Sequence, residues 1–211
     1  MRELPIRLKA HEVRAILSGA KSQTRRVVKP RYSWSIEDRD DGSLWPWYPD
    51  YVTGGEWDGW VPCPFGQPGD RLWVKETTVR VEEHGYIGPV YAASQEGEDV
   101  INWGLAPAPD DCTDVEPYEI KLRPSIHMPR SMCRLVLEIT DVGVERLQAI
   151  SEADALSEGI TRHADGHGFH VEDGRFYAAN AVTSFADLWA STGSEWEANP
   201  WVWVISFRRL P

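Results

Sequence analysis

The sequence predicts an α+β fold, a small, mostly antiparallel β-barrel decorated with short helices. About six strand-like and three helix-like segments are intermixed along the 211 residues. They do not alternate regularly, which disfavours a doubly wound parallel sheet and favours a barrel. A chain of this length usually forms one domain. We therefore expect a single domain over 1–211, with two insertions at about 32–68 and 94–118.

The first strand and helix are expected at the start of the chain. Residues 5–9 alternate apolar and charged side chains, as a half-buried strand does. Apolar residues at helical spacing follow within 11–18, and Gly19 stands where helices commonly end. We interpret residues 20–26 as a polar loop leaving that helix, and 27–30 as a short strand stopped by proline.

Two long segments then interrupt the regular pattern. Residues 32–68 contain five tryptophans and many Gly, Pro and Asp residues without periodicity, so we expect little regular structure there. Residues 94–118 are acidic and contain proline, which predicts a second surface insertion. Two interpretations of the tryptophans stay open. They form an aromatic wall that stacks on a planar ring, or they pack the insertion onto the body.

The remaining elements carry clearer patterns. Ser151 and Asp154 form a sequence like a capping box, which predicts a helix start. The nearly continuous apolar run near the end of the chain predicts a strand buried on both faces. The full set consists of strands at 71–77, 86–93, 133–139 and 201–207, helices at 151–158 and 184–190, and a turn or short helix at 145–150.

Composition excludes several classes of protein. Hydrophobic residues make up 42% and charged residues 26% of the chain, as in ordinary globular domains. No apolar run approaches the ~18 residues of a transmembrane helix, and we expect no secretory signal. Three cysteines without a C-x-x-C pair argue against a disulfide framework and a zinc knuckle. We expect a cytoplasmic protein with reduced thiols.

Charge is distributed unevenly along the chain. The net charge is −11, yet residues 1–31 contain nine basic and two acidic residues and carry +7. The other residues therefore carry −18. An acidic surface repels an extended polynucleotide, whereas a basic mouth on an acidic body can attract one phosphate, one nucleotide or a short segment. A solvated basic face without a ligand is the alternative interpretation.

The segment 19–26 concentrates groups that can perform chemistry. It contains an amine, two hydroxyls and two guanidiniums, on Lys21, Ser22, Thr24, Arg25 and Arg26. A deprotonated lysine amine can act as a general base and activate a neighbouring hydroxyl as a nucleophile. A basic surface loop without catalytic function is the other interpretation.

With later segments, this loop resembles the ASCH domain family, whose members have a PUA-like β-barrel. The resemblance extends over nearly the whole chain. The closing segment resembles the longer ASCH proteins that are common in phages and prophages. The matching residues are 16–26, 69–76, 135–139, 157–160 and 199–207.

The resemblance implies an activity. Small ASCH proteins include amidohydrolases that remove the acetyl group from 4-acetylcytidine with a Lys, a Thr and a Glu, which fall here on Lys21, Thr24 and Glu158. Lys21 would take the proton of Thr24, whose Oγ would attack the amide carbonyl, while Glu158 would hold the lysine or protonate the leaving amine. Arg26 or a backbone amide would stabilise the oxyanion.

Further residues are expected to bind the substrate. Besides Arg25, Arg26 and Ser22, these are Glu76 and Trp73. Glu76 ends a predicted strand, so it either lines the same cavity or forms a salt bridge with a nearby cation.

We expect neither a cofactor nor a bound metal. His163, His167 and His170 form a His-rich tract, but its glycines and lack of helical periodicity indicate a hairpin in which the three need not converge. The expected partner is a small nucleoside or a short RNA, with no membrane and no obligate protein partner. Two alternatives stay open. One is an RNA- or nucleotide-binding module without catalysis, and the other is a ribonuclease.

Overall fold

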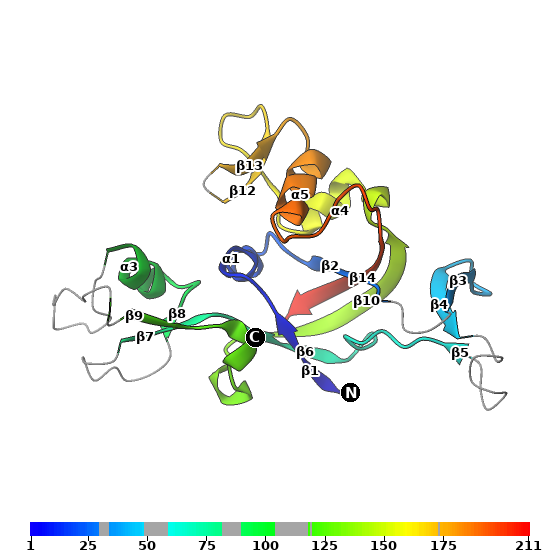
Figure 1. Ribbon diagram of the computed structural model, residues 1–211, viewed down its shortest axis with the longest axis horizontal. Helices are drawn as coiled ribbons and strands as arrows, with labels where there is room; N and C mark the ends of the chain where they lie inside the picture. The colour runs from blue at the N-terminus through cyan, green and yellow to red at the C-terminus, as the bar shows by residue number, and fades with distance from the viewer. Residues whose placement is uncertain (30–33, 49–58, 82–89, 104–117, 119, 173) are drawn as a thin grey trace.

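The computed structural model describes residues 1–29, 34–48, 59–81, 90–103, 118, 120–172 and 174–211. A five-stranded sheet lies at its centre (Figure 1). β1 and β6 are parallel, and the other neighbours are antiparallel. In spatial order the strands are β1 (Glu3–Arg7), β6 (Arg71–Lys75), β10 (Val136–Arg146), β14 (Trp201–Arg209) and β2 (Gln23–Val27).

The two outer strands of this sheet, β1 and β2, leave it open. Helix α1 (Ala10–Leu17) connects them along the chain, and among the described residues no ladder pairs one with the other. The predicted mixture of helices with mostly antiparallel sheets is therefore confirmed, but the described residues form no closed barrel. The opening between β1 and β2 matters because the main cleft lies there.

Helix α1 forms as its sequence pattern predicts. Val13 and Ile16 are buried against the main core, and Gly19 adopts a φ of 81° just after the helix end. The interpretation of 20–26 as a loop is wrong from Gln23 onward, because β2 begins there and pairs with β14. Its long polar side chains find partners on both faces of the sheet, so their polarity does not prevent a strand.

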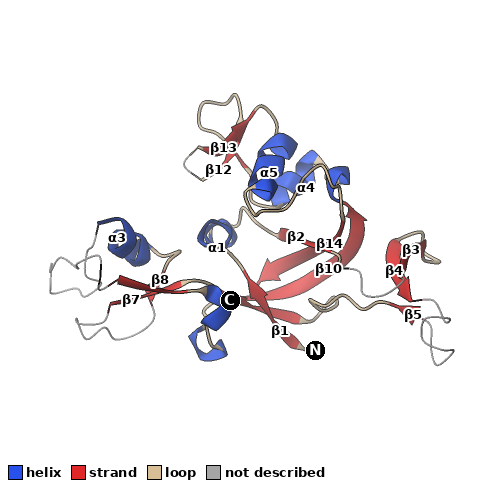
Figure 2. Cartoon of the chain, in the orientation of Figure 1, coloured by secondary structure: helices blue, strands red, loops and turns tan. Residues whose placement is uncertain are grey.

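A second layer lies over the β2 side of the main sheet, as Figure 2 shows. It has its own apolar core, which includes Leu147, Phe185 and Val202. The predicted capping box is confirmed, because Ser151 Oγ accepts from the backbone N–H of Asp154. The elements of this layer are α4 (Glu152–Ser157), α5 (Ala181–Ala190), β11 (Thr161–Arg162), β12 (Phe169–Val171) and β13 (Arg175–Ala178).

The insertion at 32–68 contains more regular structure than expected. β3 (Ser35–Asp38), β4 (Leu44–Tyr48) and β5 (Gly59–Trp60) form an antiparallel sheet. Trp45 packs edge-on against Trp203 of β14, with ring centroids 5.0 Å apart. The packing interpretation thus holds for Trp45, whose ring belongs to the main core. Trp57 lies outside the described residues.

The second insertion also contains regular structure. Residues 95–103 form helix α3 (Gln95–Trp103), which packs near a sheet of β7 (Thr78–Val81), β8 (Val90–Tyr91) and β9 (Ile120–Arg123). Half of the strand predicted at 86–93 lies outside the described residues; in the described half, Val90 and Tyr91 form β8 and residues 92–93 form a turn. Gly97 lets α3 approach β8, because a Cβ there would lie within 2.0 Å of the carbonyl oxygen of Tyr91.

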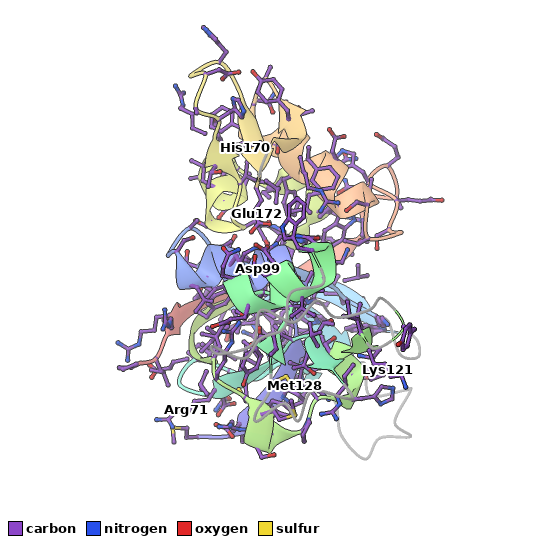
Figure 3. The ribbon with its side chains drawn as sticks, turned by 90° about the vertical axis from the view of Figure 1, so that its left-hand side faces the viewer. Arg71, Asp99, Lys121, Met128, His170 and Glu172 are labelled. Atoms are coloured by element: carbon purple, nitrogen blue, oxygen red, sulfur yellow. The ribbon has the colours of Figure 1, made fainter. Side chains whose placement is uncertain are left out.

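Arg14 of α1 connects helix α3 with the layer that contains β12. It forms ion pairs with Glu98 of α3 and with Glu172, which directly follows β12. Figure 3 labels Asp99, the neighbour of Glu98, and Glu172, and shows them on adjoining layers. Helix α1 is thereby held between α3 and the β11–β13 sheet.

Short 3₁₀ turns complete the fold. The turn or helix expected at 145–150 is confirmed as η3 (Leu147–Ala149), while the strand expected at 133–139 begins later and runs on to Arg146. The other two turns are η1 (Ser125–His127) and η2 (Arg130–Met132). Across the part of the chain that the structure describes, no helix is long and apolar enough to cross a membrane.

Candidate functional site

The main cleft lies in the opening between β1 and β2 and has a volume of about 1010 Å³. That is at the upper end of the ~300–1,000 Å³ typical of small-molecule sites. Its walls include residues of β1, the start of α1, β2 and α5, together with the end of β6 and η1. Because the two outer strands do not pair with each other, the sheet leaves an open space between them, and the cleft occupies that space.

Lys21 and Glu158 meet in this cleft. Lys21 Nζ donates to Glu158 Oε2 at 2.6 Å and to the backbone carbonyl of Glu158 at 2.8 Å. The two residues are only 4% and 5% exposed, although both contribute to the cleft wall. A backbone bridge between them fixes the pair, because it joins the segment just before β2 to the residue that caps the end of α4. Two residues that are far apart in sequence thus form one buried ion pair.

Gly159 makes this approach possible. Its φ of 100° is unfavourable for any residue with a side chain. A Cβ there would also lie 3.3 Å from Lys21 Cβ and 3.1 Å from Ala15 Cβ. The glycine therefore ends α4 and leaves room for Lys21.

Arg25 holds the other oxygen of Glu158. Its guanidinium donates to Glu158 Oε1 at 3.2 Å and to Glu145 Oε1 at 2.6 Å, and it lies 3.7 Å from Asp154 Oδ2. Arg25 is 1% exposed and lies beside the ring of Phe185. Glu158 is therefore fixed between two cations, one at each carboxylate oxygen.

Thr24 lies close to this pair in sequence but on the other face of β2 from Arg25. Its side chain shares a face with Ile205 of the main core, and the residue is fully buried. Thr24 Oγ1 accepts from Arg26 Nη1 at 2.7 Å. Among the described residues, no hydrogen bond joins Thr24 to Lys21, and Thr24 is not among those that line the cleft. Arg26 covers its hydroxyl instead.

Glu12 lies between Lys21 and Arg26. It was not predicted from the sequence. Its Oε1 lies 3.9 Å from Lys21 Nζ and 3.7 Å from Arg26 Nη2. Burial raises the pKa of Glu12, but the charges of Lys21 and Arg26 outweigh burial and hold this pKa below its usual value of 4.5. A signal was present, because Glu12 is one of only two acids in the basic segment 1–31.

His11 also faces the cleft from α1 and was not predicted. Burial lowers its pKa from the usual 6.5, although Glu12 and Glu172 oppose this shift. The imidazole is consequently neutral at neutral pH.

Three of the predicted substrate-binding residues lie elsewhere. Ser22 is exposed and does not line the cleft. Glu76 is buried and accepts two hydrogen bonds from the guanidinium of Arg134, at 2.9 and 2.8 Å. Of the two interpretations given for Glu76, the structure therefore shows the salt bridge. Trp73 lies beside Lys75 and Arg130 rather than in the cleft wall. The structure therefore does not bring these three to the Lys21–Glu158 pair.

The histidine tract forms a local cluster. The rings of His163 and His170 meet edge-on, with centroids 4.8 Å apart, while Asp165 accepts from the backbone N–H of His167. Within the described residues no group of three or more His, Cys, Asp or Glu side chains is arranged to hold a metal ion. Cys63 and Cys133 are free thiols, and Cys112 lies outside the described residues.

Comparison with known proteins does not add to this geometry: no family model, no curated protein and no solved structure matches the chain. The residues of the cleft therefore carry the functional argument.

Proposed function

We propose that this chain is an ASCH-type domain of PUA-like fold, and that its cleft hydrolyses the acyl amide on the exocyclic amine of a modified cytosine nucleoside such as N4-acetylcytidine. One observation carries the proposal. Lys21 and Glu158, which the family resemblance names as catalytic, form a buried 2.6 Å pair in the wall of the cleft of about 1010 Å³ described above. A buried, rigid proton-transfer pair beside a ligand-sized space is what amide hydrolysis needs.

The proposed reaction balances through these residues. Thr24 Oγ1 attacks the acyl carbonyl, a C–O bond forms, and the hydroxyl proton passes to the Lys21–Glu158 pair. The pair returns a proton to the exocyclic nitrogen as the C–N bond breaks and cytidine leaves. Water then cleaves the acyl–Thr24 ester, which releases the acid and restores the hydroxyl.

Arg26 has to move for this attack to occur. In the structure its guanidinium donates to Thr24 Oγ1, and it is 27% exposed at the cleft. A swing toward the substrate uncovers the hydroxyl and brings a cation to the developing oxyanion, as the resemblance implies for Arg26. Arg25 remains in place and acts as a positioning residue for Glu158.

The test separates the enzymatic alternatives. The purified protein is incubated with N4-acetylcytidine and, in parallel, with an unmodified oligoribonucleotide, and products are separated by chromatography. Release of cytidine and acetate with the oligoribonucleotide intact supports the amidohydrolase. Cleavage of the oligoribonucleotide with acetylcytidine unchanged supports the ribonuclease instead.

Thr24→Val tests the nucleophile, because valine keeps the shape and removes the hydroxyl. We expect turnover to fall by about 10³-fold or more, as for other catalytic nucleophiles. Thr183→Val, at an exposed position on α5, is the matched control and should retain full turnover. Unchanged turnover in Thr24→Val would exclude threonine attack.

A binding module without catalysis is the second candidate. The observation that favours it is the basic character of the cleft wall, whose described residues include seven Lys and Arg residues and two Glu residues. In that case cytidine is not released from N4-acetylcytidine, while RNA binds with an affinity that falls steeply with salt.

A further inference from the structure

The cleft wall has the opposite charge balance from the rest of the protein. The chain as a whole has 33 acidic and 22 basic side chains. Among the described residues of the cleft wall, acids are nevertheless scarce, and both of them, Glu12 and Glu158, are engaged with cations of the site. The basic members of the wall are Arg7, Lys9, Lys21, Arg25, Arg26, Lys29 and Lys75.

These cations form two groups. Lys21, Arg25 and Arg26 are held by the hydrogen bonds and ion pairs of the site described above. Arg7, Lys9 and Lys29 are exposed, and within the described residues their side chains have no acidic partner. We call these three residues, together with Lys75, the basic rim.

The arrangement of the basic rim is unfavourable without an anion. Arg7 and Lys75 are direct partners in the β1–β6 ladder, and like charges at paired positions repel. Lys75 Nζ donates to the backbone carbonyl of Ile126 at 2.7 Å, which orients its charge without neutralising it. In a chain with surplus acid, a group of unneutralised cations at the mouth of one cleft creates a local positive potential that attracts an anion.

An apolar wall lies in the same cleft. Phe185, Leu188 and Trp189 of α5 are all buried and line it, near the Arg25–Glu158 ion pair. The cleft thus combines an apolar surface for a planar ring with the Lys21–Glu158 pair and a positive mouth. This is the complement of a molecule with a base at one end and a phosphate at the other.

We infer that the cleft binds a cytosine nucleotide, with the base inside and its 5′-phosphate at the basic rim, in preference to the neutral nucleoside. The inference rests on the proposed function, whose substrate it specifies as the phosphorylated form. A single nucleotide fits the observations better than an extended polynucleotide, because residues outside the basic segment 1–31 carry −18 and repel a long chain.

The test is a binding measurement that does not depend on turnover. Isothermal titration calorimetry compares cytidine 5′-monophosphate with cytidine on the wild-type protein at low and high salt. We expect the monophosphate to bind at least about tenfold more tightly at low salt, since one charge-assisted contact contributes about that much, and the difference to shrink at high salt. Equal affinities at low salt would overturn the inference.

The double variant Lys9→Gln/Lys29→Gln assigns the effect to the basic rim. Its preference for the monophosphate over cytidine should fall at least severalfold. Arg175→Gln/Arg209→Gln removes two exposed cations outside the cleft and is the matched control, which should keep the wild-type preference. An equal loss in both double variants would mean that net charge, rather than the rim, attracts the phosphate, and would also overturn the inference.

Two further outcomes separate this inference from the proposed function. If N4-acetylcytidine is not hydrolysed but the monophosphate preference and its loss in the rim variant are observed, the phosphate site stands and the hydrolase proposal fails. If a cytidine tetranucleotide binds far more tightly than the monophosphate, with a steep salt dependence, the ligand is single-stranded RNA and the assignment to a mononucleotide fails.

Discussion

At the scale of single residues, Glu158 joins the two buried cations of the site. It is buried, and each of its carboxylate oxygens receives a hydrogen bond from a different buried cation, Lys21 or Arg25. Burying two cations is costly unless they are paired. Glu158 is therefore needed for stability as well as for the proposed chemistry, and the two effects have to be measured separately.

Glu158→Gln should lower the free energy of unfolding by about 3–5 kcal/mol, because buried Lys21 loses its nearest counter-charge and buried Arg25 loses one of its carboxylate partners. Urea unfolding measures this loss. Glu138→Gln is the matched control, since its ion pair with Arg208 at 2.7 Å is largely exposed and should contribute under about 1 kcal/mol. Similar losses in both variants would contradict the buried network.

The lowered pKa of Glu12 predicts how the free energy of unfolding depends on pH. Its pKa in the folded protein lies below the usual 4.5, so the stabilisation that it contributes is complete above that value and is lost as pH falls below it. The free energy of unfolding of the wild type should decrease more steeply than that of Glu12→Gln as the pH is lowered from about 6 to about 3. Parallel curves for the two proteins would show that Glu12 is not paired.

At the scale of elements, the junction of α4 with β2 decides whether the site assembles. Glu158 caps the end of α4, and Gly159 turns the chain beside Lys21. The backbone N–H of Ser22 donates to the carbonyl of Ser157 at 2.9 Å, which fastens the two elements together.

Gly159→Ala should destabilise the protein by about 1–3 kcal/mol, because a φ of 100° strains alanine and its Cβ crowds Lys21. Thermal unfolding measures the loss. Gly166→Ala is the control for conformational strain alone, since its φ is 74° and a Cβ there meets nothing within 4 Å. Turnover should fall in Gly159→Ala and remain unchanged in Gly166→Ala.

The elements that were predicted correctly carry local signals. The capping box at Ser151, the helical spacing in α1 and the apolar run of β14 each specify their own structure. β2 was missed because its side chains are polar, and only the β14 ladder and the ion pairs of Arg25 reveal why they are ordered. The β3–β5 sheet was missed because its three strands are short and irregularly spaced in sequence.

For the site, the composition of segment 19–26 already indicated Lys21, whereas Glu158 was indicated only through the family resemblance. Their meeting depends on the approach of α4 to β2, which is a tertiary contact. Segment 19–26 and the resemblance both named Thr24, but neither indicated that the strand geometry of β2 puts it on the opposite face from Arg25, with its hydroxyl covered by Arg26. Glu76 was ambiguous in sequence, and its partner Arg134 becomes its neighbour only in the fold.

At the scale of the whole molecule, the incomplete closure of the main sheet and the uneven charge are related. The outer strands β1 and β2 both come from the basic segment 1–31, so the opening between them is lined by cations. The acidic remainder of the chain forms the three inner strands of the sheet and the layers around it. The opening between β1 and β2 thus provides the cleft. Because both strands belong to the basic segment 1–31, the cleft is also positively charged.

Trp45→Ala tests how firmly the β3–β5 sheet is attached to this architecture. The ring is 8% exposed and packs on Trp203, so its loss should lower the free energy of unfolding by about 3–5 kcal/mol. Trp60→Ala, on the more exposed β5, is the control and should cost clearly less. Equal small losses would mean that this sheet contributes little to the main core.

The most direct test of the central claim is the rate of cytidine release from N4-acetylcytidine by the wild type and by Lys21→Ala, at equal concentrations of folded protein. The account predicts measurable release by the wild type and a loss of at least about 10³-fold in the variant, because the proton-transfer pair is removed. Lys121→Ala, outside the cleft, should match the wild type. Equal release by the wild type and Lys21→Ala, or none by the wild type, would contradict a hydrolytic site at the Lys21–Glu158 pair.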